Sequence, residues 1–459
     1  MTVVPNRDLS VDLARVLCLL AVVAIHTAMV GIGGQGGELE LSNPLTGLWF
    51  FAVGTWLGQV MPLFFLLGGF GAYMAMSRRS GEDTDRRSGE SDEGSFGEHL
   101  RRRTLRLGLP AAVFYSVVAV VALILLLAGS PPEMLDSALE GAGDPLWFMA
   151  AFLICQGFVR AQHRLVVSGG PRRLCAVAAA TVAGIVCIDA VRLMLLAREG
   201  LEGGAVGVVG TTGTPADALG LLNMWLLWPL LQLIGMLLAH GSLSRVRAWA
   251  WAVTAICSFA ATAALATWAP YPTDMLMNLN PPTLPLLTIG LTHLALFQLL
   301  RPVLGAVAGV RPIQGVMALI ASRAMHLYLW HMTVIILLNG LLWLSGVAPE
   351  PGEPTWWWTR IPLYLLAVGL TLGLTWPLGA LERVRPVGRL GRAGPLLGWA
   401  ALYVAVAPNL VVTHLGLNSV TVWIGAVLMA AGVVLAAAPR AREEDPAARR
   451  NGQGSSGGG

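Results

Sequence analysis

The stretch DLARVLCLLAVVAIH, residues 12–26, is an apolar run with an acid and a base at one end and a histidine at the other. An α-helix has 3.6 residues per turn, so Arg15 and His26 share one of its faces, about 16 Å apart along the axis. Asp12 lies one turn before Arg15 and can pair with it. An Asp or Arg at membrane depth costs roughly 2.5–3.5 kcal/mol, so this polar stripe must face something other than lipid.

The composition indicates an integral membrane protein. Of the 459 residues, 55% are hydrophobic and 12% are charged, whereas a soluble domain has about 25% charged residues. The net charge is +4, and the arginines lie in loops between apolar runs, so we expect no nucleic-acid partner. The five cysteines lack metal-ligand or disulfide spacing, and no His-Glu-x-x-His motif occurs, so we expect no metal site.

Twelve apolar runs are long enough, or nearly so, to form membrane-spanning helices of about 20 residues. They lie near residues 10–30, 47–76, 104–128, 145–160, 174–196, 217–239, 248–269, 283–300, 319–344, 361–380, 394–410 and 417–438. The fourth and eleventh runs are at the short limit. The sequence therefore predicts an all-α fold, a polytopic transmembrane helical bundle.

Arginine is concentrated in alternate loops, which predicts the orientation of the chain. The segment 77–106 is rich in arginine, whereas the loops 31–46 and 129–144 have none. Because positive charge stays on the cytoplasmic side, we expect both termini to be cytoplasmic. The expected organisation is a transmembrane domain at 1–384 with a mobile cytoplasmic loop at 77–100, two additional helices at 385–439 and a disordered tail at 440–459.

Five stretches of the chain form an ordered set of motifs. They are RDLSVDLARVLCLLAVVAIH from residue 7, QVMPLFFLLGGF from residue 59, RRRTLRLGLP from residue 101, PLWFMAAFL from residue 145 and HLYLWHMTV from residue 326. Over about residues 7–380 the set resembles the acyltransferase-3 family of bacterial integral-membrane acyltransferases and O-acetyltransferases. Arg15 and His26 match the family's basic residue, ten intervening positions and histidine. Two features depart from the family: Gly68-Gly69 replaces its common Ser-Gly, and two helices follow its usual ten core helices.

The resemblance implies transfer of an acyl group, acetyl in the first place, from cytoplasmic acyl-CoA as co-substrate. Such a transfer needs a base to take the proton of the acceptor, and neutral histidine is the usual choice. We expect His26 to be this base, with Arg15 and Asp12 orienting the donor or the helix. The alternative for all three residues is a stripe that serves helix packing.

The arginine run before the third helix is the expected donor-binding site. Guanidinium groups suit phosphate oxygens, so Arg102, Arg103 and Arg106 would contact the phosphates of acyl-CoA. The alternative is that the run anchors the helix at the cytoplasmic face.

Four residues are possible members of an acceptor site. Asp144 and Trp147 lie at the expected outer end of the fourth helix, at a depth similar to that of His26, and Tyr328 and His331 lie one turn apart in the ninth helix. The alternative for Trp147 is an interfacial aromatic anchor. The alternative for His331 is a histidine that only packs between helices.

The sequence thus predicts a multi-pass acyltransferase of the cell membrane, in the bacterial plasma membrane. Its acceptor would be a hydroxyl, in preference to an amine, of a glycan, lipid or small metabolite. A twelve-helix secondary transporter is the main rival, since intramembrane charges also mark transport pathways. A non-catalytic relative that binds or exports a glycan is a third alternative.

Overall fold

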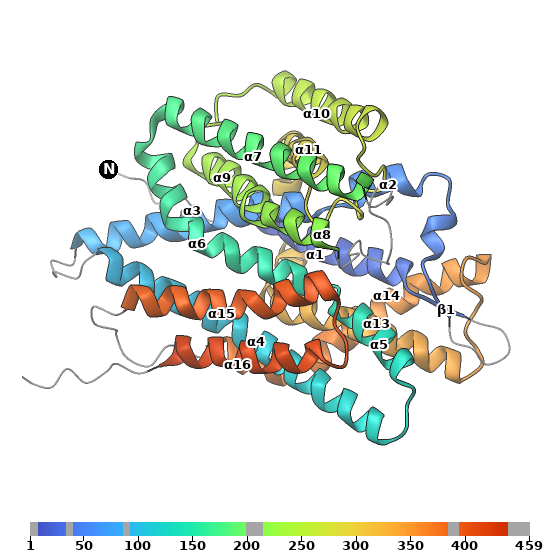
Figure 1. Cartoon of the computed structure of the whole chain (residues 1–459). Helices are drawn as coiled ribbons and strands as arrows, with labels where there is room; N and C mark the ends of the chain where they lie inside the picture. The colour runs from blue at the N-terminus through green and yellow to red at the C-terminus, as the bar shows by residue number, and fades with distance from the viewer. Residues whose placement is uncertain (1–7, 34–39, 86–91, 199–213, 384–393, 439–459) are drawn as a thin grey trace, which may run out of the picture.

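The computed structural model describes residues 8–33, 40–85, 92–198, 214–383 and 394–438. They form a helical bundle with one short hairpin (Figure 1). The α-helices are α1 (Leu9–Met29), α2 (Phe51–Gly58), α3 (Met61–Asp85), α4 (Asp92–Leu127), α5 (Pro132–Gly143), α6 (Leu146–Ser168), α7 (Gly170–Arg198), α8 (Pro215–Gly220), α9 (Leu227–His240), α10 (Ala248–Trp268), α11 (Leu284–Ala308), α12 (Arg311–Ser322), α13 (Ala324–Leu344), α14 (Pro354–Leu374), α15 (Gly394–Leu415) and α16 (Thr421–Ala437). Short 3₁₀ helices are η1 (Pro44–Gly47), η2 (Leu221–Trp225) and η3 (Trp376–Arg383), and the antiparallel strands are β1 (Gly31–Gly33) and β2 (Glu40–Ser42).

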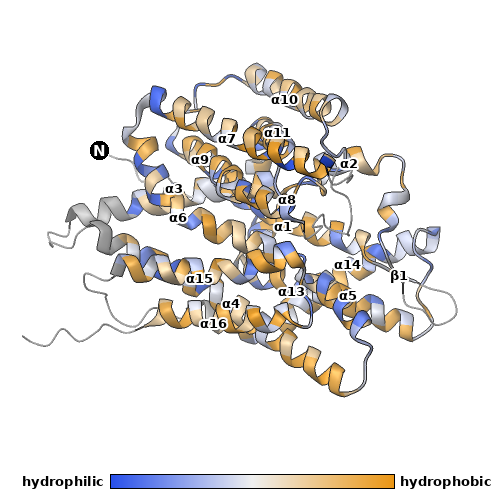
Figure 2. Cartoon of the chain, viewed as in Figure 1, coloured by the Kyte–Doolittle hydropathy of each residue, from blue (hydrophilic) through white to orange (hydrophobic). Residues whose placement is uncertain are grey.

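The structure confirms the polytopic helical bundle. Within the described residues, 11 helical segments are long and apolar enough to cross a membrane, one fewer than the twelve expected, and the twelfth apolar run forms the shorter helix α16, with 17 residues. Figure 2 shows hydrophobic residues along most of these helices and hydrophilic residues gathered towards their ends. The chain is therefore a multi-pass membrane protein, and the cytoplasmic location of its termini stays a prediction.

Two segments differ from the sequence-based expectation. The polar segment 77–100 is largely helical, because α3 continues to Asp85 and α4 begins at Asp92. Glu and Arg are good helix formers, so these helices can extend beyond the apolar region. The second segment is the fourth apolar run, near residues 145–160. The helix there is longer than the run, because α6 continues past Arg160 to Ser168. Residues 86–91 and the expected tail at 440–459 lie outside the described residues.

Glycines bring α3 and α9 into backbone contact. A Cβ atom on Gly69 would overlap the main-chain carbonyl of Gln232, and one on Gly235 would overlap that of Leu66. Lipid tails are as apolar as the helices, so the hydrophobic effect does not hold membrane helices together. Small residues let the two backbones approach closely, and this close packing stabilises the contact. The second glycine of the Gly68-Gly69 pair therefore has a packing role.

The two helices beyond residue 385 pack against the rest of the bundle. Figure 1 shows α15 and α16 beside α4, and α15 also contacts α6. The Tyr115 hydroxyl on α4 donates to Asn409 Oδ1 on α15 at 3.2 Å. The fully buried Arg101 donates to the carbonyls of Ala436 and Ala438 at the end of α16. These bonds satisfy polar groups that lipid could not satisfy.

Helix α1 lies inside the bundle, where it contacts α3, α11, α13 and α14. Asp8 caps its first turn by accepting the backbone N–H groups of Ser10 and Val11 at 3.0 and 3.3 Å. Its second oxygen accepts from Arg301 on α11. Burial raises the pKa of Asp8, but the hydrogen bonds from Ser10 and Arg301 outweigh burial and hold this pKa below its usual range. The cap and the ion pair together fix the start of the helix that carries the polar stripe.

Candidate active site

The structure joins the histidine of α1 to a histidine of α13. His26 Nδ1 lies 2.7 Å from His331 Nε2, a hydrogen bond between residues 305 positions apart in the chain. The two ring planes differ by only 8°, with centroids 5.0 Å apart. His331 is fully buried, whereas His26 retains some exposure. His331 is therefore the more deeply buried member of the pair, and neither histidine lines the cavities described below.

The partners of His331 determine which nitrogens of the pair carry protons. His331 Nδ1 lies 2.7 Å from the carbonyl of Tyr328 and 3.2 Å from that of Leu327. A carbonyl can only accept, so Nδ1 is protonated and, in the neutral ring, Nε2 is the acceptor. His26 must then donate from its own Nδ1. Its Nε2 keeps a free lone pair, with no hydrogen bond among the described residues, and can accept a proton from another molecule.

A series of aromatic rings extends from His331 towards the start of α6. The ring centroid of Tyr328 lies 5.8 Å from that of His331 and 4.4 Å from that of Phe148. Trp147 lies beyond, with its ring centroid 6.0 Å from that of Phe148. All of these rings are at most 6% exposed. The structure thus brings Trp147, Tyr328 and His331 to one buried region next to His26.

On one side of this aromatic region lies a cavity of about 330 Å³, called here the arginine cavity. Its cationic lining residues are Arg15, Arg103 and Arg106, and no carboxylate lines it. The rest of its wall is mainly apolar and includes Phe148 and Tyr328. Small-molecule pockets occupy roughly 300–1,000 Å³, so the cavity is large enough for part of a ligand. Its charge suits an anionic one.

Arg15 occupies this cavity with unused hydrogen-bonding capacity. Its guanidinium carbon lies 5.7 Å from the centroid of the Phe64 ring, and its buried Nε has no hydrogen-bond partner within the described residues. Asp12, on the preceding turn, attracts the Arg15 guanidinium electrostatically. Buried polar groups are nearly always bonded, so an open donor in a cavity points to a ligand or water.

The structure divides the arginine run that the sequence grouped together. Arg102 is exposed, does not line the arginine cavity and pairs with Glu98 Oε1 at 2.9 Å. Arg101 is buried and also bonds Glu98. Only Arg103 and Arg106 face the cavity. The spacing of Glu98 to Arg102, i to i+4, is the sequence signal that could have separated them.

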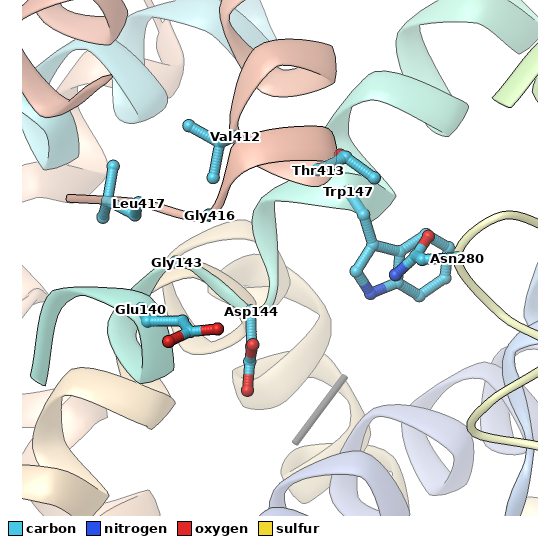
Figure 3. A pocket seen from close by; sticks show the side chains of 9 residues that line it. All are labelled: Glu140, Gly143, Asp144, Trp147, Asn280, Val412, Thr413, Gly416 and Leu417. Atoms are coloured by element: carbon cyan, nitrogen blue, oxygen red, sulfur yellow. The ribbon is translucent and has the colours of Figure 1, made fainter. Parts of the chain in front are cut away.

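A second and smaller cavity lies at the junction of α5 and α6, close to Trp147 (Figure 3). It has a volume of about 30 Å³ and is called here the carboxylate pocket. It is lined by Glu140, Gly143, Asp144, Trp147, Asn280, Val412, Thr413, Gly416 and Leu417. Asp144, predicted to lie near the acceptor, therefore belongs to a pocket that shares no lining residue with the arginine cavity.

The loop that carries Asn280 is held by a buried polar network. Asp189 on α7 accepts hydrogen bonds from Asn223, from the hydroxyl of Tyr271 and from the backbone N–H of Leu284, at 2.8, 2.9 and 2.9 Å. Burial and the adjacent Asp189 carboxylate raise the pKa of Tyr271, so its hydroxyl remains a donor. The network fixes both ends of the loop between α10 and α11, and Asn280 with it.

Comparison with known proteins supports one family. A family model described as an acyltransferase domain matches residues 8–381, which includes α1 to α14. No curated protein matches the chain, and no solved structure does. The matched region contains the histidine pair and the arginine cavity, whereas α15 and α16 lie beyond it.

Proposed function

Because the chain belongs to the acyltransferase-3 family, we propose that it transfers an acyl group, acetyl in the first place, from acyl-CoA to a hydroxyl of a glycan, lipid or small metabolite. The coarser activity, a membrane acyltransferase, follows from the family and the spanning helices. Family membership favours acyl transfer over the transporter alternative. The observation that carries the finer proposal is the hydrogen bond between His26 and His331.

In the proposed reaction, His26 Nε2 takes the proton of the acceptor hydroxyl as its oxygen attacks the thioester carbonyl carbon. The C–O bond forms, the C–S bond breaks, and the proton passes from His26 to the leaving CoA sulfur. While His26 is cationic, its Nδ1–H bond to His331 becomes a charge-assisted hydrogen bond, which is stronger than a neutral one. His331 thus positions the base and stabilises its charged form.

The arginine cavity is the proposed donor site. Arg103 and Arg106 supply cations for the phosphates of acyl-CoA, with Arg106 the more exposed of the two. The apolar wall continues to Tyr328, whose ring neighbours His331. A donor with charged and apolar ends would therefore place its thioester near the histidine pair. Arg15, with its open Nε, would contact the donor between these ends.

The test is acyl transfer by the purified full chain in lipid nanodiscs. Free CoA should be measured by chromatography, which reports the thiol of CoA separately from the five free cysteines of the protein. His26→Ala should lower the rate per folded molecule by about 10²–10⁴ while acetyl-CoA still binds. His293→Ala is the matched control, because His293 is another buried histidine, bonded to the Trp56 carbonyl at 3.0 Å. A fully active His26→Ala protein would refute the proposed base.

A further inference from the structure

The carboxylate pocket contains polar groups whose partners are missing from the protein. Asn280 is only 2% exposed, yet its Oδ1 has no hydrogen-bond partner within the described part of the chain. Asn280 and Trp147 both line the pocket, and Figure 3 labels the two side chains there. Leaving a buried amide unpaired is costly, so a group from outside the protein is expected to bond it.

Two carboxylates share the pocket with this amide. Glu140 and Asp144 are one helical turn apart, and Figure 3 shows both carboxyl groups on the same side of the α5–α6 junction. Neither carboxyl group has a hydrogen bond or an ion pair with another side chain or backbone group among the residues that the structure describes. Carboxylates accept hydrogen bonds, the amide of Asn280 can both donate and accept, and Trp147 offers an apolar ring face. This combination suits hydroxyl groups carried on a carbon skeleton.

The opposite wall of the pocket comes from outside the family match. Val412 and Thr413 lie on α15, and Gly416 and Leu417 lie in the turn that follows it. The family match ends at residue 381, so these residues lie beyond the matched part of the chain.

That wall is held in place by contacts with α5. Asp136 Oδ1 accepts the backbone N–H of Ser419 at 2.8 Å. A side chain at Gly143 would overlap Leu417, so the turn can approach α5 this closely only because residue 143 is glycine. Gly416 has a φ of +73°, which also favours glycine. The pocket is therefore a built feature of the α5–α15 contact.

We propose that α15 and the turn that follows it complete an acceptor subsite in which Asn280, Glu140, Asp144 and Thr413 bind non-reacting hydroxyls of a polyol acceptor, such as a sugar. This inference rests on the proposed acyl transfer and adds the chemical class of the acceptor. A volume of about 30 Å³ admits a hydroxyl or hydroxymethyl group and not a whole ring. The remainder of the acceptor would extend along the aromatic residues so that another hydroxyl reaches His26.

The experiment compares acceptors that differ in hydroxyl content. The full chain in nanodiscs receives acetyl-CoA with methyl glucoside, 1-propanol or propylamine, and CoA release is followed for each. We expect methyl glucoside to have a lower KM than 1-propanol. Asn280→Ala and Thr413→Val should each raise the KM for methyl glucoside about three- to tenfold, the loss of one hydrogen bond, with kcat changed less than about twofold. The rate with 1-propanol should not change, because this alcohol has no second hydroxyl.

The matched control is Glu133→Gln, which replaces an exposed carboxylate on α5 outside the pocket and should leave both KM values unchanged. Equal KM values for the two alcohols, or pocket variants that match the wild type, would overturn the subsite while leaving acyl transfer intact. Preference for propylamine that is lost in Glu140→Gln would overturn the polyol assignment in favour of an amine. Failure to acetylate either alcohol would overturn the proposed function and the subsite with it.

Discussion

Replacing His331 with alanine tests whether the histidine pair acts as a unit. His331 does not need to touch the substrate in the proposed reaction. Its role is to accept the Nδ1–H of His26 at 2.7 Å while its own Nδ1–H bonds the Tyr328 carbonyl at 2.7 Å. Without His331, the His26 ring loses the bond that fixes its tautomer and its orientation.

The size of the effect follows from that one hydrogen bond. A buried donor left without its acceptor costs about 1–3 kcal/mol. The bond strengthens as His26 becomes cationic, so the cost falls on the transition state and lowers kcat. Since 1.4 kcal/mol corresponds to a tenfold change, kcat should fall by about 5- to 150-fold. This loss is smaller than the one expected for His26→Ala, and the KM for acyl-CoA should stay nearly constant.

The assay is kcat per folded molecule as a function of pH, with His293→Ala as the control for loss of a buried histidine. His331→Gln retains a side-chain acceptor and should recover part of the activity. A His331→Ala protein with wild-type kcat and an unchanged pH profile would refute the tautomer argument. A loss as large as that of His26→Ala, without recovery in His331→Gln, would indicate that His331 itself contacts the substrate.

Three further predictions concern the donor, the stability of the fold and its orientation. Arg106→Ala should raise the KM for acyl-CoA about tenfold or more through a lost charge-assisted contact, whereas Arg102→Ala should change it less than about twofold because Arg102 lies outside the cavity; equal effects would contradict the division of the run. Arg192→Met should lower the free energy of unfolding by about 3–5 kcal/mol because it breaks the buried ion pair between Arg192 and Asp217, and Arg192→Met with Asp217→Leu should be more stable than the single variant in thermal unfolding. A reporter active only outside the cytoplasm should be active when fused after Ala138 and inactive at the C-terminus, and the reverse pattern would invert the expected orientation.

The bundle was predictable from the sequence because lipid imposes a length and a composition on each spanning helix. Apolar runs of about 20 residues gave the approximate positions of the 11 candidate spans in the described residues and of the shorter helix α16. Their ends were less predictable, since a helix continues into water when its residues favour helix, as in α3 beyond Ser77 and in α6 beyond Arg160.

The candidate site was predictable only where its residues share a helix. The common face of Arg15 and His26 follows from helical periodicity. The bond from His26 to His331 joins residues 305 positions apart, so no local pattern contains it. Asn280 belongs to a loop, and its open amide depends on the packing of three separate parts of the chain. A periodicity argument cannot supply such contacts.

The aromatic residues between the two cavities also bear on the electrical properties of the membrane. A membrane enzyme whose substrates enter from both faces must not let ions cross the bilayer. Each elementary charge that crosses a potential of 100 mV dissipates about 2.3 kcal/mol of the stored free energy. Trp147 lines one cavity, Phe148 and Tyr328 line the other, and all three rings are at most 6% exposed. These large, uncharged side chains separate the two cavities when no substrate is bound, so vesicles that contain the protein should retain a potassium diffusion potential. Trp147→Ala removes the largest of the three side chains and should make them leak.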